Sequence, residues 1–128
     1  SYSHCEIVFS DGVMFSSHLA DKGTRYVQGV IRPDFWDGLW IPTTLEDETR
    51  IRRWCDSELY CRYDWKGIFF SQFLKLQREH PDKWFCSEIC AAIVQMVGFL
   101  KGTKPCSFSP GKLYTRLVNE GAKPCEVW

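Results

Sequence analysis

A cysteine in the second half of the chain has the surroundings expected of a nucleophile. Cys86 follows two aromatic residues, Trp84 and Phe85, and opens the most convincing helical pattern of the sequence, residues 86–100. At the start of a helix, unpaired amide groups and the helix dipole favour an anion, so the pKa of a cysteine there can fall from about 8.5 to about 3.5–7.5. We therefore expect Cys86 to form a thiolate nucleophile, although most cysteines of this kind only fill space in a core.

A nucleophilic thiol needs a base, and the sequence holds three histidines. His4 opens an extended segment, and Glu6 shares its face because strand side chains alternate with a period of two. A carboxylate beside an imidazole fixes its tautomer and stabilises the imidazolium, but a polar residue on a solvated sheet face is an equally ordinary explanation for Glu6. His18 follows a second extended segment and is a turn residue or a member of the site, whereas His80 precedes a proline in a polar loop.

The first third of the chain has the alternating pattern of β-strands. Residues 4–9 and 13–17 flank an Asp-Gly pair at positions 11–12, which is a strong signal for a hairpin. A second extended pair is expected at residues 25–31 and 39–42, with turn residues between them. This half of the chain therefore predicts antiparallel sheet.

From Thr44 onward the apolar residues follow helical spacing. Thr44 is a good N-cap, and acidic residues at 46–48 load the first turn of the helix that follows. Residues 86–100 are apolar nearly all round, which indicates a central helix. Further helices are expected at residues 68–76, after a turn at 63–67, and from Ser109 and Pro110 to about Asn119. Sheet first and helices after predicts a small α+β domain.

The composition bounds the class of protein and its partners. The chain has 128 residues, with 16 Lys and Arg against 16 Asp and Glu, so it lacks the positive charge of a protein whose main partner is nucleic acid. Seven cysteines, an odd count without regular spacing, favour free thiols and therefore the cytoplasm, although Ser1 leaves room for a signal peptide removed upstream. The most apolar stretch, residues 89–100, is shorter than the roughly 20 residues of a membrane span, so no transmembrane segment is expected. The oligomeric state stays open.

Four segments, in their order, resemble one enzyme family. Residues 3–8 (Ser-His-Cys-Glu-Ile-Val) are similar to the histidine strand of the circularly permuted papain-like (NlpC-like) hydrolases, in the YiiX-like branch related to lecithin retinol acyltransferase. Residues 63–67 resemble the Tyr-Asp-Trp turn of that branch, residues 85–88 its Cys-Ser-Glu nucleophile motif, and residues 109–114 its closing helix. The histidine precedes the cysteine, as permutation requires, and the resemblance covers nearly the whole chain.

The resemblance implies one permuted papain-like domain over residues 1–128, with a small antiparallel sheet packed against the helix that carries the cysteine. It implies Cys86 as the nucleophile and His4 as the general base. The family's next polar residue, often a histidine, has no counterpart in the closest register, so Glu6 is the first choice for the orienting residue and His18 the second. The backbone N–H of Cys86 is expected to donate to the oxyanion, with Tyr2 as a further candidate donor.

The implied activity is that of a cysteine peptidase or amidase, a thiol-protease type of hydrolase that acts on a peptide or acyl-amide substrate, including cell-wall peptides, through an acyl-enzyme. It needs no cofactor and no metal. A lipid acyl hydrolase or acyltransferase with the same dyad is the first alternative. A non-catalytic binding module, built on the aromatic residues of segment 35–40, is the second. Zinc ligation by Cys86, Cys90 and Cys5 is a weaker reading, since structural zinc sites usually use two close-spaced pairs.

Overall fold

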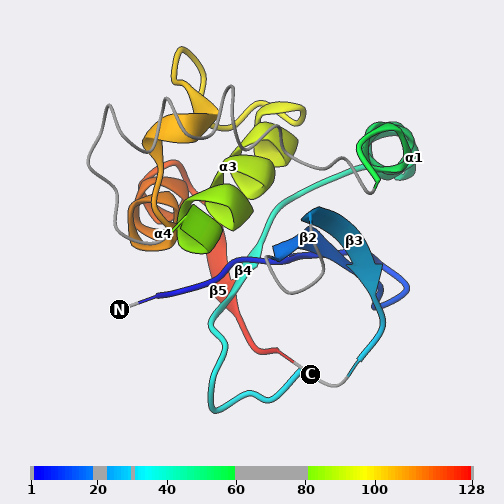
Figure 1. The fold of residues 1–128 in the computed structure, drawn as a ribbon. Helices are drawn as coiled ribbons and strands as arrows, with labels where there is room; N and C mark the ends of the chain where they lie inside the picture. Colours follow the sequence, from blue (N-terminus) through cyan, green and yellow to red (C-terminus); the bar gives the residue numbers. More distant parts are fainter. Residues whose placement is uncertain (1, 19–22, 30, 60–80, 128) are drawn as a thin grey trace.

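The computed structural model describes residues 2–18, 23–29, 31–59 and 81–127 (Figure 1). Along these ranges the elements are, in chain order, β1 (Ile7–Val8), β2 (Met14–His18), β3 (Gly23–Val27), β4 (Gly38–Trp40), α1 (Leu45–Ser57), α3 (Pro81–Gln95), the 3₁₀ helix η2 (Pro105–Ser107), α4 (Pro110–Asn119) and β5 (Lys123–Cys125). The expected turn at 63–67 and helix at 68–76 lie outside these ranges. What is described is a small α+β fold with antiparallel sheets, as predicted.

The sheets confirm the first hairpin and correct the second pair of strands. β1 and β2 are antiparallel around Gly12, whose φ of 86° is readily adopted only by glycine, and the Phe9 N–H donates to the carbonyl of Val13 at 2.9 Å. The expected pairing of residues 25–31 with 39–42 is wrong. β3 pairs instead with β2, and β4 pairs with β5, where Gly38 lies opposite Cys125. The Lys-Pro-Cys sequence of β5 gave no strand signal, because proline is disfavoured in strands.

Two helix starts agree with the sequence. Thr44 caps α1 in a reciprocal capping box, since its hydroxyl accepts from the N–H of Asp47 at 3.0 Å and the Asp47 carboxylate accepts from the Thr44 N–H at 3.0 Å. Ser109 caps α4, with Pro110 in its first turn. These short-range signals fix where α1 and α4 begin.

The boundaries of α3 differ from the predicted 86–100. The helix begins at Pro81, a residue suited to a first helical position, and ends at Gln95. Its end is fixed by the Gln95 amide, which donates to the carbonyls of Leu100 at 3.1 Å and Thr103 at 2.8 Å. Gly98 and Leu100 take positive φ values of 97° and 58°, so the apolar stretch turns back on itself instead of continuing as helix.

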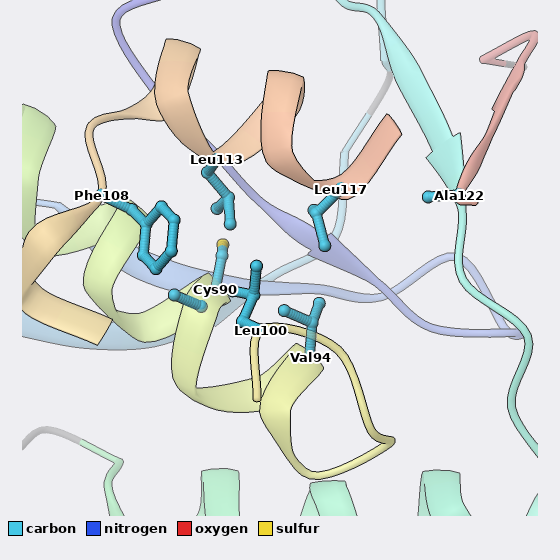
Figure 2. Close-up of a cluster of buried hydrophobic side chains, with 8 residues drawn as sticks. Cys90, Val94, Leu100, Phe108, Leu113, Leu117 and Ala122 are labelled. Atoms are coloured by element: carbon cyan, nitrogen blue, oxygen red, sulfur yellow. The ribbon is translucent and has the colours of Figure 1, made fainter. Parts of the chain in front are cut away.

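Helix α3 is central, as its sequence predicted. It packs against both β2 and α4, and Figure 1 shows it between α4 and the three-stranded sheet. One buried cluster lies where α3 faces α4 and contains Cys90, Ala91, Val94, Leu100, Phe108, Leu113, Leu117 and Ala122 (Figure 2). The other lies where α3 faces the sheet and α1, and contains Phe9, Phe15, Ile51, Cys55, Ile89 and Ile93. Both cores therefore share one helix.

Candidate active site

The structure brings together two residues that lie far apart in the sequence. His4 lies in the extended segment that leads into β1, and Cys86 lies on α3. Their side chains are joined by a hydrogen bond that acts on the pKa of each group. The side chain of His4 is 20 % exposed, whereas Cys86 is fully buried. The imidazole is therefore the member of the pair that solvent reaches.

Glu6 is the second neighbour of the imidazole. The Nε2 atom of His4 lies 2.7 Å from the Oε1 atom of Glu6, and the Glu6 side chain is only 6 % exposed. An ionised carboxylate only accepts, so Nε2 carries the proton of this hydrogen bond. His18, the other candidate for the third position, ends β2 opposite Gly23, and its side chain lies outside what the structure describes.

Arg25, which the sequence did not single out, completes this group of side chains. From β3 its guanidinium donates to both oxygens of Glu6, at 3.1 Å to Oε2 and 2.5 Å to Oε1. Its side chain is 12 % exposed. The sequence signal that could have pointed to Arg25 is a charged residue in the middle of a short strand. Such a residue needs a partner or solvent for its charge, and the sequence alone does not identify that partner.

The pKa values of this group follow from burial and from these contacts. Burial lowers the pKa of His4, but the hydrogen bonds and charges of Cys86 and Glu6 outweigh it and raise that pKa to about 9. Burial raises the pKa of Glu6, but hydrogen bonds from His4 and Arg25 hold it below its usual value. At neutral pH the group is therefore an imidazolium, a carboxylate and a guanidinium.

The environment of Cys86 differs from the one expected at a helix start. Cys86 is the sixth residue of α3, beyond the first turn to which the dipole effect is confined. The Cys5 thiol, which also contacts Cys90, is hydrogen-bonded to it; this contact and burial raise the pKa of Cys86 more than His4 lowers it. The expected low pKa is wrong. The N–H of Cys86 lies within the i to i−4 ladder, so the expectation of a free oxyanion donor there is wrong as well.

One aromatic residue packs against His4, and a second pair of rings includes Tyr2, the other candidate oxyanion donor. The ring of Trp36 meets the imidazole edge-on, with centroids 6.1 Å apart. The rings of Tyr2 and Tyr114 lie 5.1 Å apart, and the Tyr2 hydroxyl donates to the carboxylate of Asp37. That bond raises the pKa of Tyr2 to about 12. The Tyr2 hydroxyl is thus committed to Asp37, which speaks against its expected role as an oxyanion donor.

The other expected features are placed as follows. Phe35 is 74 % exposed and Trp40 59 % exposed, so two rings of the aromatic segment face solvent. The six cysteines in the described ranges are all free thiols. No group of three or more His, Cys, Asp or Glu side chains able to hold a metal ion occurs in the part of the chain that the structure describes.

No helix within these ranges combines the length and the apolar character needed to cross a membrane. Comparisons of the chain with known protein families, with curated proteins and with solved structures found no match.

Proposed function

We propose that the protein is a cysteine hydrolase of peptide or other amide bonds, with the permuted papain-like arrangement that the sequence resembles. The observation that carries the proposal is the continuous contact from the Cys86 thiol to the His4 imidazole and on to the Glu6 carboxylate. Nucleophile, base and orienting carboxylate in this order are the parts that covalent acyl transfer requires. The chain order, histidine before cysteine, is the one that a permuted domain has.

The two ring nitrogens of His4 have different roles in the proposed reaction. Nε2 is held by Glu6 at 2.7 Å, and we assign the contact with the sulfur to Nδ1. In the first step Nδ1, in the neutral imidazole, takes the proton of the Cys86 thiol, and the sulfur attacks the carbonyl carbon of the substrate. Glu6 stabilises the imidazolium that this transfer creates.

Two further steps complete the reaction. The tetrahedral intermediate collapses, the imidazolium gives its proton to the leaving amine, and the acyl group stays on Cys86 as a thioester. His4 then removes a proton from water, the hydroxide attacks the thioester, and the carboxylic acid leaves as the sulfur takes back a proton. The imidazole acts first as base, then as acid, then as base again.

The route of the substrate follows from the burial of the pair. Cys86 is fully buried while the His4 side chain is 20 % exposed, so the carbonyl approaches over the imidazole edge, next to Trp36. The flat, apolar ring of Trp36 beside the imidazole suits contact with a peptide or acyl chain.

The test is an activity screen with one matched control. The wild-type protein, Cys86→Ala and Cys55→Ala are compared on cell-wall peptides, other amides, acyl-lipids and thioesters. Cys55 is a buried thiol of α1 in the core cluster that faces the sheet, so it controls for the loss of a buried sulfur. We expect turnover in wild type and Cys55→Ala, none in Cys86→Ala, and an acyl adduct on Cys86 in rapidly quenched samples. Turnover that persists in Cys86→Ala would refute the proposal.

The same screen separates the alternative acyl chemistry. A lipid acyl hydrolase or acyltransferase would use the same sulfur and the same imidazole but turn over acyl-lipids in preference to amides. The exposed rings of Phe35 and Trp40 favour a second candidate function, a binding module for apolar or sugar ligands. Such a module would bind its ligand equally well in wild type and Cys86→Ala, and would lose affinity in Phe35→Ala or Trp40→Ala.

A further inference from the structure

One oxygen atom of the site serves two positively charged donors. Oε1 of Glu6 lies 2.7 Å from Nε2 of His4 and 2.5 Å from a terminal nitrogen of Arg25, while Oε2 accepts from the other terminal nitrogen at 3.1 Å. The Glu6 and Arg25 side chains are 6 % and 12 % exposed. A bidentate guanidinium–carboxylate pair with so little solvent around it has a fixed geometry, unlike an exposed ion pair.

Arg25 reaches Glu6 across the central strand of the sheet. It lies on β3 opposite Ser16 of β2, and continuing the β1–β2 register by one residue from Ile7 and Phe15 places Glu6 level with the same Ser16. Neighbouring strands are about 4.8 Å apart, so the span is about 10 Å. Only a long side chain covers it, and only a small residue such as the fully buried Ser16 leaves room for that side chain to pass.

We propose that Arg25 is a positioning residue of the site: it clamps both oxygens of Glu6 and competes with His4 for Oε1, so that the carboxylate orients the imidazole without binding its proton too tightly. This inference rests on the proposed function and adds a residue to it. Arg25 touches neither the substrate nor the sulfur in the proposed reaction. Its effect passes through Glu6.

The sign of the effect follows from the charges around the imidazole. In the part of the chain that the structure describes, His4 contacts Glu6 of its own segment and Cys86 of α3, and Arg25 of β3 shares the Glu6 carboxylate with it. Asp37, which follows the neighbouring Trp36 in the sequence, is held by Tyr2. The guanidinium neutralises part of the Glu6 charge and repels the imidazolium that shares its oxygen. Without Arg25, the Glu6 carboxylate interacts with His4 alone, and the pKa of the His4 imidazole rises. Without Glu6, the imidazolium loses its partner.

The two substitutions are therefore expected to move His4 in opposite directions. Nuclear magnetic resonance titration of the histidine ring signals, with His4 assigned by its loss in His4→Gln, gives the midpoint for each protein. We expect Glu6→Gln to lower the His4 midpoint and Arg25→Gln to raise it, each on the order of one pH unit. Arg25→Lys, which keeps a positive charge, is expected to return the midpoint toward the wild-type value. A purely structural role for Arg25 would not give this pattern of signs.

The titration tests the positioning role of Arg25 independently of any hydrolytic activity. A His4 midpoint in Arg25→Gln that equals or falls below the wild-type value overturns it, because Arg25 would then not compete with His4 for Glu6. If Arg25→Gln does not fold, Arg25→Met keeps the apolar stem without the charge, and the same rise is expected there. The titration needs no substrate. If the protein hydrolyses no substrate, but its His4 midpoint falls in Glu6→Gln and rises in Arg25→Gln, the proposed function is refuted. The positioning role of Arg25 then still stands.

Discussion

His4 and Glu6 form a nearly buried pair within one short extended segment, with Nε2 and Oε1 2.7 Å apart. The pair forms between positions i and i+2, because alternate side chains of an extended chain lie on the same face. Burial lowers the pKa of His4, but the contacts with Cys86 and Glu6 raise it to about 9, so the imidazolium is the stable form at neutral pH. A base that is already protonated must release its proton before it can activate a thiol, and this requirement governs the pH dependence of the site.

Hydrolysis is expected to increase with pH up to about 9. The thiol of Cys86, whose pKa is raised by the Cys5 contact and by burial, needs a neutral His4 to accept its proton. Below pH 9 the neutral fraction of His4 changes about tenfold per pH unit, and kcat/KM should follow it. The measurement is kcat/KM between pH 5 and 10. A plateau that is already reached below pH 7 would show that neither raised pKa limits the reaction.

Glu6→Gln is expected to lower the maximal kcat by about 10²- to 10⁴-fold. The amide can still meet the imidazole but cannot stabilise the imidazolium formed in each acid–base step. Glu48→Gln is the matched control, because Glu48 is a carboxylate of α1 that accepts from Ser10, outside the site. His18→Asn, on β2, should lower kcat less than Glu6→Gln does. A greater loss in His18→Asn than in Glu6→Gln would assign the orienting role to His18.

Tyr2→Phe is expected to leave kcat nearly unchanged. The hydroxyl of Tyr2 donates to Asp37, so its removal does not take a donor from the reacting carbonyl. Loss of a true oxyanion donor costs about 10²- to 10³-fold in kcat. Steady-state kinetics on the best substrate of the screen distinguish the two cases, and a loss of that size would restore Tyr2 as an oxyanion donor.

The stability of the fold is expected to fall as the pH rises from about 6.5 to about 9. The folded-state pKa of His4 is raised above its unfolded value of 6.5, so its contribution is complete below pH 6.5 and disappears as the pH passes through about 9. Urea unfolding at several pH values measures the free energy directly. In His4→Gln the decrease over this range should be smaller. An equal decrease in both proteins would assign it to another group.

Ser87→Ala is expected to destabilise the fold by about 1–3 kcal/mol. The buried Ser87 hydroxyl donates to the carbonyl of Phe108 at 2.6 Å, and its loss leaves that carbonyl without this donor between α3 and the end of η2. Ser107→Ala is the control, since the exposed Ser107 hydroxyl donates to the carbonyl of Lys104 within one turn. Denaturant unfolding should give a clearly larger loss for Ser87→Ala. Equal losses would argue that the buried bond contributes no more than the exposed one.

The features that the sequence predicted well depend on neighbouring residues. The hairpin around Gly12, the capping box at Thr44 and the side-chain pair of His4 and Glu6 each arise within a few positions. The start of α3 was predicted too late, because the apolar pattern begins at Phe85 whereas Pro81 and the polar residues after it form its first turn.

Long-range partners were beyond the reach of the sequence pattern. The pairing of β4 with the proline-containing β5 brings together residues more than eighty positions apart, and no local propensity encodes it. Arg25 was missed for the same reason: its role appears only when β2 brings β3 level with the segment that holds Glu6. The contact of the Cys5 thiol with Cys86, which together with burial raises the pKa of Cys86, likewise joins two distant segments of the chain.

Because α3 contributes side chains to both buried clusters and also carries Cys86, the two clusters of the described residues are expected to open together. Local unfolding that exposes α3 would disrupt both clusters at once, so its central backbone amides should exchange with solvent only through opening of the whole domain. The sulfur of Cys86 is therefore expected to lie in a slowly exchanging helix, and reactions at that sulfur should depend on motions of the side chains beside His4 rather than on local opening of the core.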